Sequence, residues 1–416
     1  MKTITIINQY SGNKGDRAVC YFILTEILKL NRFNIVLSTN DRNNWKNEPI
    51  IKNNKIKLVP WGWNVENFIP KRRFDWERRR FFRLFGLPYL LNRLNNNKKG
   101  LGLAWLFINK EFKAAINISD IILSTGGHHL TTKFTPDCHN ELLFDLAAVT
   151  LLNRNLIFWS QTFGPFDFKA VSNENAVRNI LNRANHIYIR DIKSFEVLRA
   201  LKVSEANVKK TYESVIGLNT TLNEYKLPSK RENLVGITVY NAESRTEFEY
   251  QQYCRTIAQI TDWLIKKGFN VKFFPHEIKG AVVDDRKCIN DILSFDLGKE
   301  NVIIEQNDLT TEQHLAEIMK CKVFIGHKTH SVIFALTVGT PLIAISYHPK
   351  TIDFLKEYKL EENLIKDDEL NIDRFISVFN FTYNNLDNIG LHEFEKSSFF
   401  AKSIQNDLKE ELLKIS

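Results

Sequence analysis

This sequence of 416 residues has few cysteines, few prolines and no long apolar run. Its five cysteines are scattered, odd in number and never spaced as CxxC, so we expect neither a disulfide framework nor a zinc site. The thiols are predicted to be buried and reduced. Only ten prolines occur, and the composition is not that of a disordered, collagen-like or repeat protein.

Long apolar segments are also missing. No stretch approaches the ~20 apolar residues that span a bilayer. The opening run Met1–Asn8 meets polar residues too early for a secretory signal peptide. These two absences predict a cytoplasmic protein, either free or at the inner face of the membrane.

A cationic, aromatic segment within residues 70–95 supplies much of the net charge of +9. It contains Lys71-Arg72-Arg73, Arg78-Arg79-Arg80, Arg83, Trp76, Phe81, Phe82 and Phe85. One interpretation is an amphipathic segment that lies on an anionic membrane surface, and the other is an ordinary helix with solvated arginines. Both stay open at this stage. A purely nucleic-acid-binding protein would leave the polar loops described below unexplained, so no nucleic-acid partner is expected.

Short apolar, β-branched runs alternate with helical patterns along most of the chain. This alternation predicts an α/β protein of two doubly wound, Rossmann-like domains that face a cleft. We place an N-terminal domain at 1–230, a C-terminal domain at 231–360 and a bracing helical segment at 361–416. The predicted strands are Ile4–Asn8, Ile35–Thr39, Ile121–Thr125, Leu156–Gln161, His186–Arg190, Leu234–Tyr240, Val271–Phe274, Val302–Glu305, Val323–Ile325 and Leu342–Ser346.

Polar residues follow several of these strands, where ligands bind in sheets of this kind. After the first strand, Asn13, Gly15 and Asp16 precede an apolar helix whose N-terminus favours an anion. The alternative is that Asp16 only caps the helix and the glycines only make a turn.

After the third strand stand Gly126, Gly127, His128 and His129. Glycines bring the backbone close to a ligand, and imidazoles can hydrogen-bond to sugar hydroxyls. Metal binding is disfavoured because adjacent residues point in different directions and no carboxylate or thiolate cluster accompanies them. The alternative is a structural role for at least one of the two histidines.

Arg190 ends a further strand and can hold a carboxylate or phosphate through two parallel hydrogen bonds. The alternative is an Arg190–Asp191 pair that organises the loop, with Asp191 capping the next helix.

The most informative stretch lies between a buried strand and an apolar helix. His327, Lys328, His330 and Ser331 gather around the predicted start of this helix, and Lys350 follows the next strand. A cation, imidazoles and backbone N–H groups in one place suit an anionic substrate that needs proton transfer.

Taken in order, the segments GNKGDRAV, STGGHH, QTFGPF, YIRDIKS, GHKTHSVIFAL and GTPLIAISYHPK resemble the polysaccharide pyruvyltransferase family from Asn8 to about Lys359. The resemblance implies a fold similar to GT-B glycosyltransferases and phosphoenolpyruvate as donor. It also implies a pyruvate ketal on an exopolysaccharide, a capsule or a lipid-linked precursor as product. His330 matches the family's motif histidine and Arg190 its donor-binding arginine. Lys328 stands where arginine is usual, and Glu213 stands where aspartate is common.

These patterns together predict a transferase without a metal or other cofactor. His330 and Lys328 are the predicted catalytic residues. Arg190, Lys328, His330, Ser331, His327 and Lys350 are the predicted donor-binding residues. Asn13, Gly15, Asp16, Gly126, Gly127, His128 and His129 are the predicted acceptor-binding residues. The alternative is a GT-B-type glycosyltransferase that contacts a sugar nucleotide through Pro275-His276-Glu277.

Overall fold

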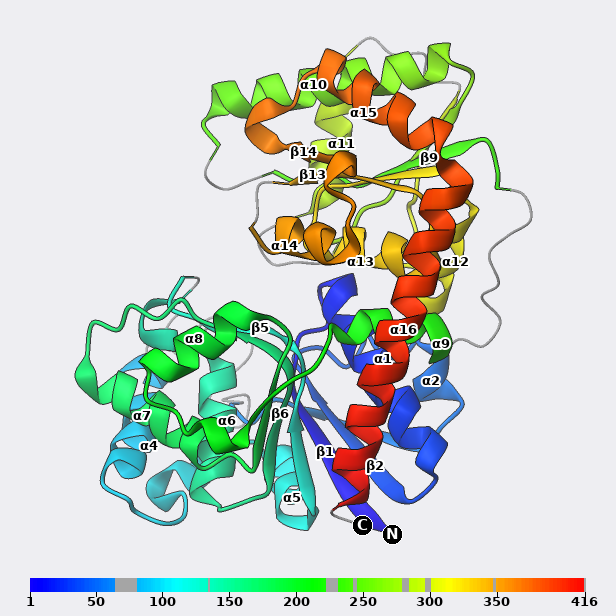
Figure 1. Ribbon diagram of the computed structural model, residues 1–416. Coiled ribbons are helices and arrows are strands. Elements are labelled where there is room, and N and C mark those ends of the chain that lie inside the picture. The colour runs from blue at the N-terminus through cyan, green and yellow to red at the C-terminus, as the bar shows by residue number, and fades with distance from the viewer. Residues whose placement is uncertain are drawn as a thin grey trace. The chain divides into compact units, whose positions relative to one another are not determined.

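The computed structural model describes residues 1–63, 81–133, 135–221, 231–241, 245–278, 284–295, 301–346 and 349–414. The chain forms two compact α/β units (Figure 1). Unit 1 comprises Met1–Ser11, Val19–Ser214 and Ser403–Ser416, and unit 2 comprises Gly12–Ala18 and Val215–Lys402.

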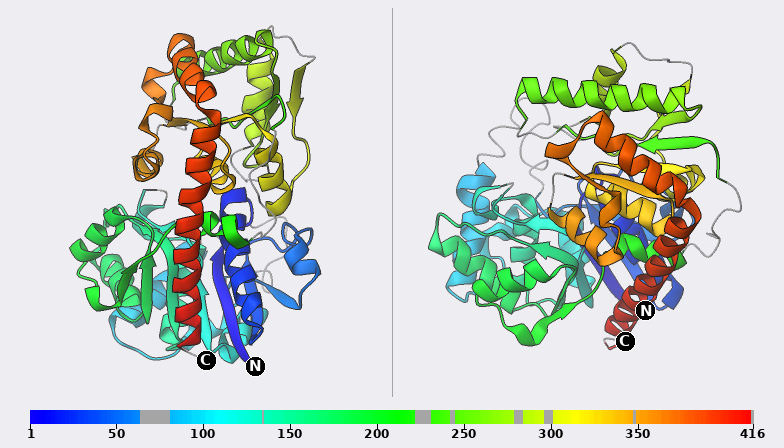
Figure 2. Two further views of the ribbon diagram at one scale, coloured as in Figure 1. Left: turned by 45° about the vertical axis from the view of Figure 1, so that its right-hand side comes forward. Right: turned by 45° about the horizontal axis from the view of Figure 1, so that its top comes forward.

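This division differs from the predicted boundaries in three places. One is Val215–Thr221, which counts with unit 2 although the predicted boundary lies after residue 230. Gly12–Ala18 belongs to unit 2, although the sequence placed it in the first domain. The C-terminal helix α16, Leu386–Leu413, is one continuous helix whose residues up to Lys402 count with unit 2 and the rest with unit 1 (Figure 2). Contacts between residues far apart in the sequence decide these points. In unit 1, for example, Glu411 accepts a hydrogen bond of 2.8 Å from the Tyr188 hydroxyl.

Unit 1 is built on an eight-stranded parallel sheet. Its order is β3-β2-β1-β4-β6-β7-β8, and β5 pairs with β6. The strands are β1 Lys2–Gln9, β2 Phe33–Thr39, β3 Ile56–Pro60, β4 Ile121–Ser124, β5 Gly127–Leu130, β6 Leu156–Phe163, β7 His186–Ile189 and β8 Val208–Lys210. The sequence predicted five of these strands and missed β3, β5 and β8.

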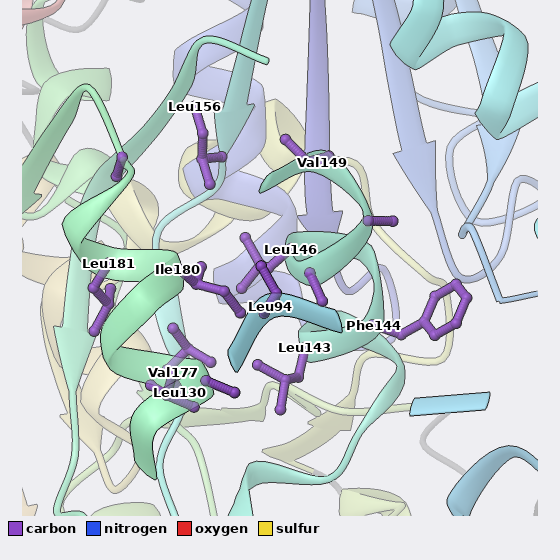
Figure 3. Packing of buried hydrophobic residues seen from close by; sticks show 14 of the residues in the cluster. Leu94, Leu130, Leu143, Phe144, Leu146, Val149, Leu156, Val177, Ile180 and Leu181 are labelled. Atoms are coloured by element: carbon purple, nitrogen blue, oxygen red, sulfur yellow. The ribbon is translucent and has the colours of Figure 1, made fainter. Parts of the chain in front are cut away.

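The main core of unit 1 lies under α6, Glu141–Leu151, which is buried along nearly its whole length. Figure 3 shows Leu143, Leu146 and Val149 of α6 packed with Leu94 and with residues of α7, Val171–Asn182. The other helices are α1 Lys14–Leu30, α2 Pro49–Lys52, η2 Phe82–Gly86, α4 Leu87–Asn95, η3 Gly102–Leu106, α5 Lys110–Ile118, η4 Pro136–Cys138, α8 Ile192–Ala200 and η5 Glu205–Asn207.

Unit 2 has a six-stranded parallel sheet of order β11-β10-β9-β12-β13-β14. The strands are β9 Leu234–Ile237, β10 Asn270–Phe273, β11 Val302–Ile304, β12 Val323–Gly326, β13 Leu342–Ser346 and β14 Leu364–Lys366. In chain order this is 3-2-1-4-5-6, the order of dinucleotide-binding folds, in which the direction of winding reverses between β9 and β12. Ligands of such sheets bind outside the carboxyl ends of the strands at this reversal. The residues after β9, β10 and β12 therefore mark the expected position of a binding site.

The helices of unit 2 cover both faces of this sheet. They are η6 Ser214–Gly217, α9 Leu218–Thr221, α10 Glu247–Lys266, α11 Asp285–Leu293, α12 Thr311–Lys320, α13 Thr329–Val338, α14 Pro349–Tyr358, η8 Glu361–Asn363, η9 Asp367–Glu369 and α15 Ile372–Asn384. From Ser331 to Val338, α13 is buried, and it ends at Gly339, whose φ of 63° is left-handed and suits glycine. No helix in the described part of the chain is long and apolar enough to cross a membrane.

Three histidines are buried in unit 2. His276, His314 and His327 have ring nitrogens without a hydrogen-bond partner among the described residues. Burial lowers the pKa of His327 to about 3, with Arg245 adding to the effect. Burial also lowers the pKa of His276 and of His314 well below the ordinary value. All three are therefore neutral near pH 7.

These histidines predict acid sensitivity of the folded state. As the pH falls below ~6.5, a histidine in the unfolded chain binds a proton, while a buried histidine in the folded protein does not. The free energy of unfolding therefore falls with pH, and each buried histidine contributes about 1.4 kcal/mol for each pH unit. Urea unfolding followed by circular dichroism should show this loss between about pH 7 and about pH 5. His327→Phe should reduce the slope by one histidine's share, and an unchanged slope would contradict the assignment.

Candidate active site

The junction between β12 and α13 is fixed by a buried hydroxyl. Ser331 Oγ donates a hydrogen bond to the carbonyl oxygen of Lys328 (2.7 Å) and accepts one from the backbone N–H of the same residue (3.2 Å). It also lies 2.9 Å from the hydroxyl of Thr238, the residue after β9. Ser331 thus holds the start of α13 in place. The structure shows it in this capping role, and its predicted donor contact stays a prediction.

His330 lies in the first turn of α13 and is half-buried. Its imidazole packs directly on Gly15, because a Cβ added to Gly15 would overlap the Cγ and Nδ1 atoms of His330. Gly15 is therefore required for the close approach of the backbone to this ring. The contact brings Gly12–Ala18 beside the motif histidine, within unit 2.

The first turn of α1, which carries Gly15, is capped by Asn13. Asn13 Oδ1 accepts hydrogen bonds from the backbone N–H groups of Gly15 (2.8 Å) and Asp16 (3.4 Å). Asn13 therefore has the capping role that one interpretation of the sequence gave to Asp16. On its other side, Asn13 forms an antiparallel bridge with Glu277.

Two buried cations in the first turn of α1 share one carboxylate. Lys14 Nζ lies 2.9 Å from Asp308 Oδ1, and Arg17 bonds to the same carboxylate. Burial alone would raise the pKa of Asp308, but Lys14 and Arg17 hold it well below its ordinary value. These ion pairs anchor Gly12–Ala18 to the segment before α12. Sequence reasoning missed Asp308, because nothing near it in the chain marks it.

Lys328 is the N-cap residue of α13, and its ammonium is bound by carboxylates. Nζ lies 2.7 and 2.9 Å from the two oxygens of Asp285 and 3.6 Å from Glu277. Asp285 also accepts hydrogen bonds from the backbone N–H groups of His276 (2.8 Å) and Glu277 (2.9 Å). One buried carboxylate therefore joins the loop after β10 to the start of α13.

His276 and Glu277 are the site residues that the sequence linked only to the sugar-nucleotide alternative. The His276 ring is buried and roughly parallel to that of His330, with 6.5 Å between ring centroids. Burial raises the pKa of Glu277; Lys328 opposes this shift and Asp285 adds to it. Their position directly after β10, where the winding of the sheet reverses, is the feature that could have identified them as site residues.

The other two predicted donor residues of unit 2 are His327 and Lys350. The His327 ring packs edge-on against Tyr253, and its backbone N–H donates to Thr238 Oγ1 (3.0 Å). Lys350 is half-buried in the first turn of α14. The hydroxyl of its neighbour Thr351 lies 2.9 Å from that of Thr329, which begins α13.

Arg190 lies in unit 1, directly after β7. Its Nε donates to Thr162 Oγ1 (2.9 Å), and its Nη1 forms a buried ion pair with Glu213. Asp191 caps α8 by accepting from the backbone N–H of Ser194 (2.8 Å). Asp191 therefore has the capping role that the sequence suggested for it. The carboxylate paired with the Arg190 guanidinium is that of Glu213.

The segment Gly126–His129 also lies in unit 1, and its last three residues belong to strand β5 instead of a loop. A Cβ on Gly126 would come within 2.8 Å of the carbonyl oxygen of Ser160, so this glycine allows close backbone packing. A ring nitrogen of His128 bonds to the carbonyl oxygen of Gly164. His128 and His129 are successive strand residues and point to opposite faces.

The geometry of the side chains also bears on metal ligation. Within the described ranges, no three His, Cys, Asp or Glu side chains form a group that could hold a metal ion. The carboxylates around His330 are instead engaged by Lys328, Lys14 and Arg17.

Structural comparison shows a GT-B-like architecture of two parallel-sheet α/β domains, shared with solved UDP-GlcNAc 2-epimerases. A UDP-GlcNAc 2-epimerase from Neisseria meningitidis bound to UDP-GlcNAc aligns over 100% of both chains with a TM-score of 0.59 and 12% identity. A putative UDP-N-acetylglucosamine 2-epimerase from Listeria monocytogenes covers 99% of this chain and 97% of its own, with a TM-score of 0.58 and 13% identity. At such identities the likeness concerns the fold alone.

Sequence comparison is more specific. The amylovoran biosynthesis protein AmsJ of Erwinia amylovora is 21% identical over 380 residues, which cover 87% of each chain. The sequence model of the polysaccharide pyruvyl transferase family matches residues 13–349, from Asn13 through α13 to the start of α14. The chain therefore belongs to the polysaccharide pyruvyl transferase family.

Proposed function

We propose that this protein transfers an enolpyruvyl unit from phosphoenolpyruvate to sugar hydroxyls and forms a pyruvate ketal during biosynthesis of a cell-surface polysaccharide. The observation that carries the proposal is the position of His330. Its half-buried imidazole lies on Gly15, within the region matched by the family, at the start of the helix that follows β12. An imidazole there can exchange protons near neutral pH.

The reaction needs two kinds of proton transfer. A sugar hydroxyl adds to C2 of phosphoenolpyruvate and loses its proton while C3 gains one. Phosphate then leaves, and a second hydroxyl adds to C2 and loses its proton to close the ketal. His330 is proposed as one acid/base group. Glu277 is a candidate for the other, because burial raises its pKa and such carboxyls suit proton transfer.

Donor binding is proposed to involve Lys328, His327, Ser331 and Lys350 in unit 2, and Arg190 in unit 1. Cations stabilise phosphate and carboxylate groups, and the N-terminus of α13 adds backbone N–H groups. Asn13, Gly15 and Asp16, together with Gly126–His129, are proposed to contact the saccharide acceptor. A lipid-linked acceptor would bring the protein to the inner face of the membrane.

A sugar-nucleotide glycosyltransferase is the competing function, and His276 and Glu277 after β10 are the residues that favour it. The fold does not decide between the two. Equilibrium binding of phosphoenolpyruvate, measured beside a panel of sugar nucleotides, separates them. Transfer is then tested by mass spectrometry of a saccharide acceptor, because a ketal-linked pyruvate identifies both the reaction and the acceptor.

Replacing the motif histidine tests its catalytic role. His330→Ala should lower kcat on the order of 10²–10⁴-fold, because a general acid/base group contributes about that much to the rate. Steady-state rates over a phosphoenolpyruvate titration, with circular dichroism to verify folding, provide the measurement. A nearly unchanged kcat would move the proton-transfer role to another residue, with His128 and His129 next in line.

Substitutions of Lys328 test a role in donor binding, in contrast to the proton-transfer role tested by His330→Ala. Lys328→Ala should mainly raise KM for phosphoenolpyruvate, and it also leaves Asp285 buried without its cation. Lys328→Arg, which restores the residue usual in the family, should retain substantial activity. Loss of activity in Lys328→Arg would show that the pair with Asp285 tolerates only an ammonium.

Gly15 tests whether the position of the imidazole matters. Gly15→Ala should displace His330 and lower kcat by about tenfold or more, since a small misplacement of a catalytic group is costly. In a His330→Ala background the same change should have little effect on kcat, because the overlap is gone. Equal losses in both backgrounds would mean that Gly15 acts independently of His330.

Activity is expected to be independent of added metal, because cations of the protein are proposed to bind the donor anions. Turnover should be the same in a chelator as in Mg²⁺-containing buffer. Activity abolished by the chelator and restored by a divalent cation would contradict this prediction.

A further inference from the structure

Large apolar side chains are exposed together on unit 1, on the two short helices η2 and η3. Phe85 is 60% exposed, Leu103 64% and Leu106 61%. Phe81, Leu84 and Trp105 are exposed as well. We call these six residues the η2–η3 surface. Contiguous exposed apolar patches on soluble proteins commonly mark interaction sites.

The contacts show that the two helices form one surface. The Phe81 ring lies 5.3 Å from that of Phe85 and 5.5 Å from that of Phe107, which directly follows η3. The backbone N–H of Leu103 donates to the Tyr89 hydroxyl (3.0 Å), which ties η3 to α4. The apolar side chains are thus held outward by a supported backbone.

The charge around this surface has one sign. From Phe81 to Ile118 the sequence carries six lysines and arginines and a single carboxylate, that of Glu111. Glu111 is paired with Arg42 at 3.0 Å. Lys98 and Lys99 are exposed, and Lys113 Nζ lies 3.8 Å from the centre of the Trp105 ring. An apolar surface with a cationic rim is complementary to an anionic lipid bilayer, which offers both hydrocarbon and negative headgroups.

We propose that the η2–η3 surface docks unit 1 on an anionic membrane. The apolar side chains enter the headgroup boundary, and Lys98, Lys99 and Lys113 contact lipid phosphates. Trp105 is suited to this boundary because its ring is amphipathic. The basic residues Lys71–Arg73 and Arg78–Arg80, for which the sequence suggested the same partner, lie outside the described residues, and the proposal does not use them.

Cosedimentation of the full chain with vesicles tests the proposal. The wild-type protein should bind vesicles of phosphatidylglycerol and phosphatidylcholine in equal parts more strongly than phosphatidylcholine alone, and added salt should weaken the binding. The double variant Phe85→Ser with Leu106→Ser should reduce the partition coefficient by at least about tenfold, since two apolar side chains no longer enter the bilayer. Lys98→Glu with Lys99→Glu should weaken binding to the anionic vesicles.

The matched control is Val171→Ser with Phe248→Ser. Each of these residues is 71% exposed and lies on a different helix, so the control removes similar exposed apolar area elsewhere. It should leave vesicle binding unchanged. Equal binding by wild type and Phe85→Ser/Leu106→Ser, or no vesicle binding by wild type, would overturn the proposal. So would sedimentation velocity showing a dimer that this variant dissociates, because a second copy would then cover the surface.

The docking proposal stands apart from the proposed reaction. Turnover of a short soluble acceptor should be the same in all these variants, because none of the residues belongs to the proposed site. Normal vesicle binding by a protein that does not use phosphoenolpyruvate would refute the reaction alone. Turnover without vesicle binding would refute the docking alone.

Discussion

The buried ion pair between Lys328 and Asp285 is the interaction on which the candidate site depends. Asp285 begins α11, Lys328 caps α13, and the same carboxylate holds the backbone of His276 and Glu277 after β10. A buried charge without a partner is destabilising, so removing either member should lower the free energy of unfolding in addition to any effect on donor binding. Lys328 fits this arrangement because its ammonium is a compact charge that two carboxylates surround.

The sequence predicted the fold well where strands are buried. All ten predicted strands are present, and their predicted ends lie no more than three residues from the observed ends. Continuous apolar runs such as Leu342–Ser346 have few alternatives to a buried strand in an α/β protein. The missed strands β3, β5, β8 and β14 are short and carry polar residues. β5 is the instructive one, because its Gly-His-His-Leu sequence has weak strand propensity and pairs with β6 through tertiary contacts.

The site was predictable in part for a topological reason. Residues just past β10 and β12 come together because parallel strands end at the same edge of the sheet, and the sequence shows which residues these are. The partners Asp285 and Asp308 could not be foreseen, because a carboxylate in a loop or first helical turn has no periodicity to mark it. The assignment of Gly12–Ala18 to unit 2 was also beyond the sequence, since it follows from contacts such as Gly15 with His330 and Lys14 with Asp308.

Charge balance explains how this site can receive an anion. The cations of the described cluster are already bound to carboxylates: Lys14 and Arg17 to Asp308, and Lys328 to Asp285 and Glu277. An incoming phosphate or carboxylate near Lys328 would therefore meet Glu277 as well as the ammonium. Glu277 is the carboxyl whose pKa burial has raised, and a negative group beside it would raise that pKa further. In the proposed reaction, an anionic donor bound here would favour uptake of a proton by Glu277. That proton would remove the repulsion and would place an acid beside the donor, where the enol carbon needs one.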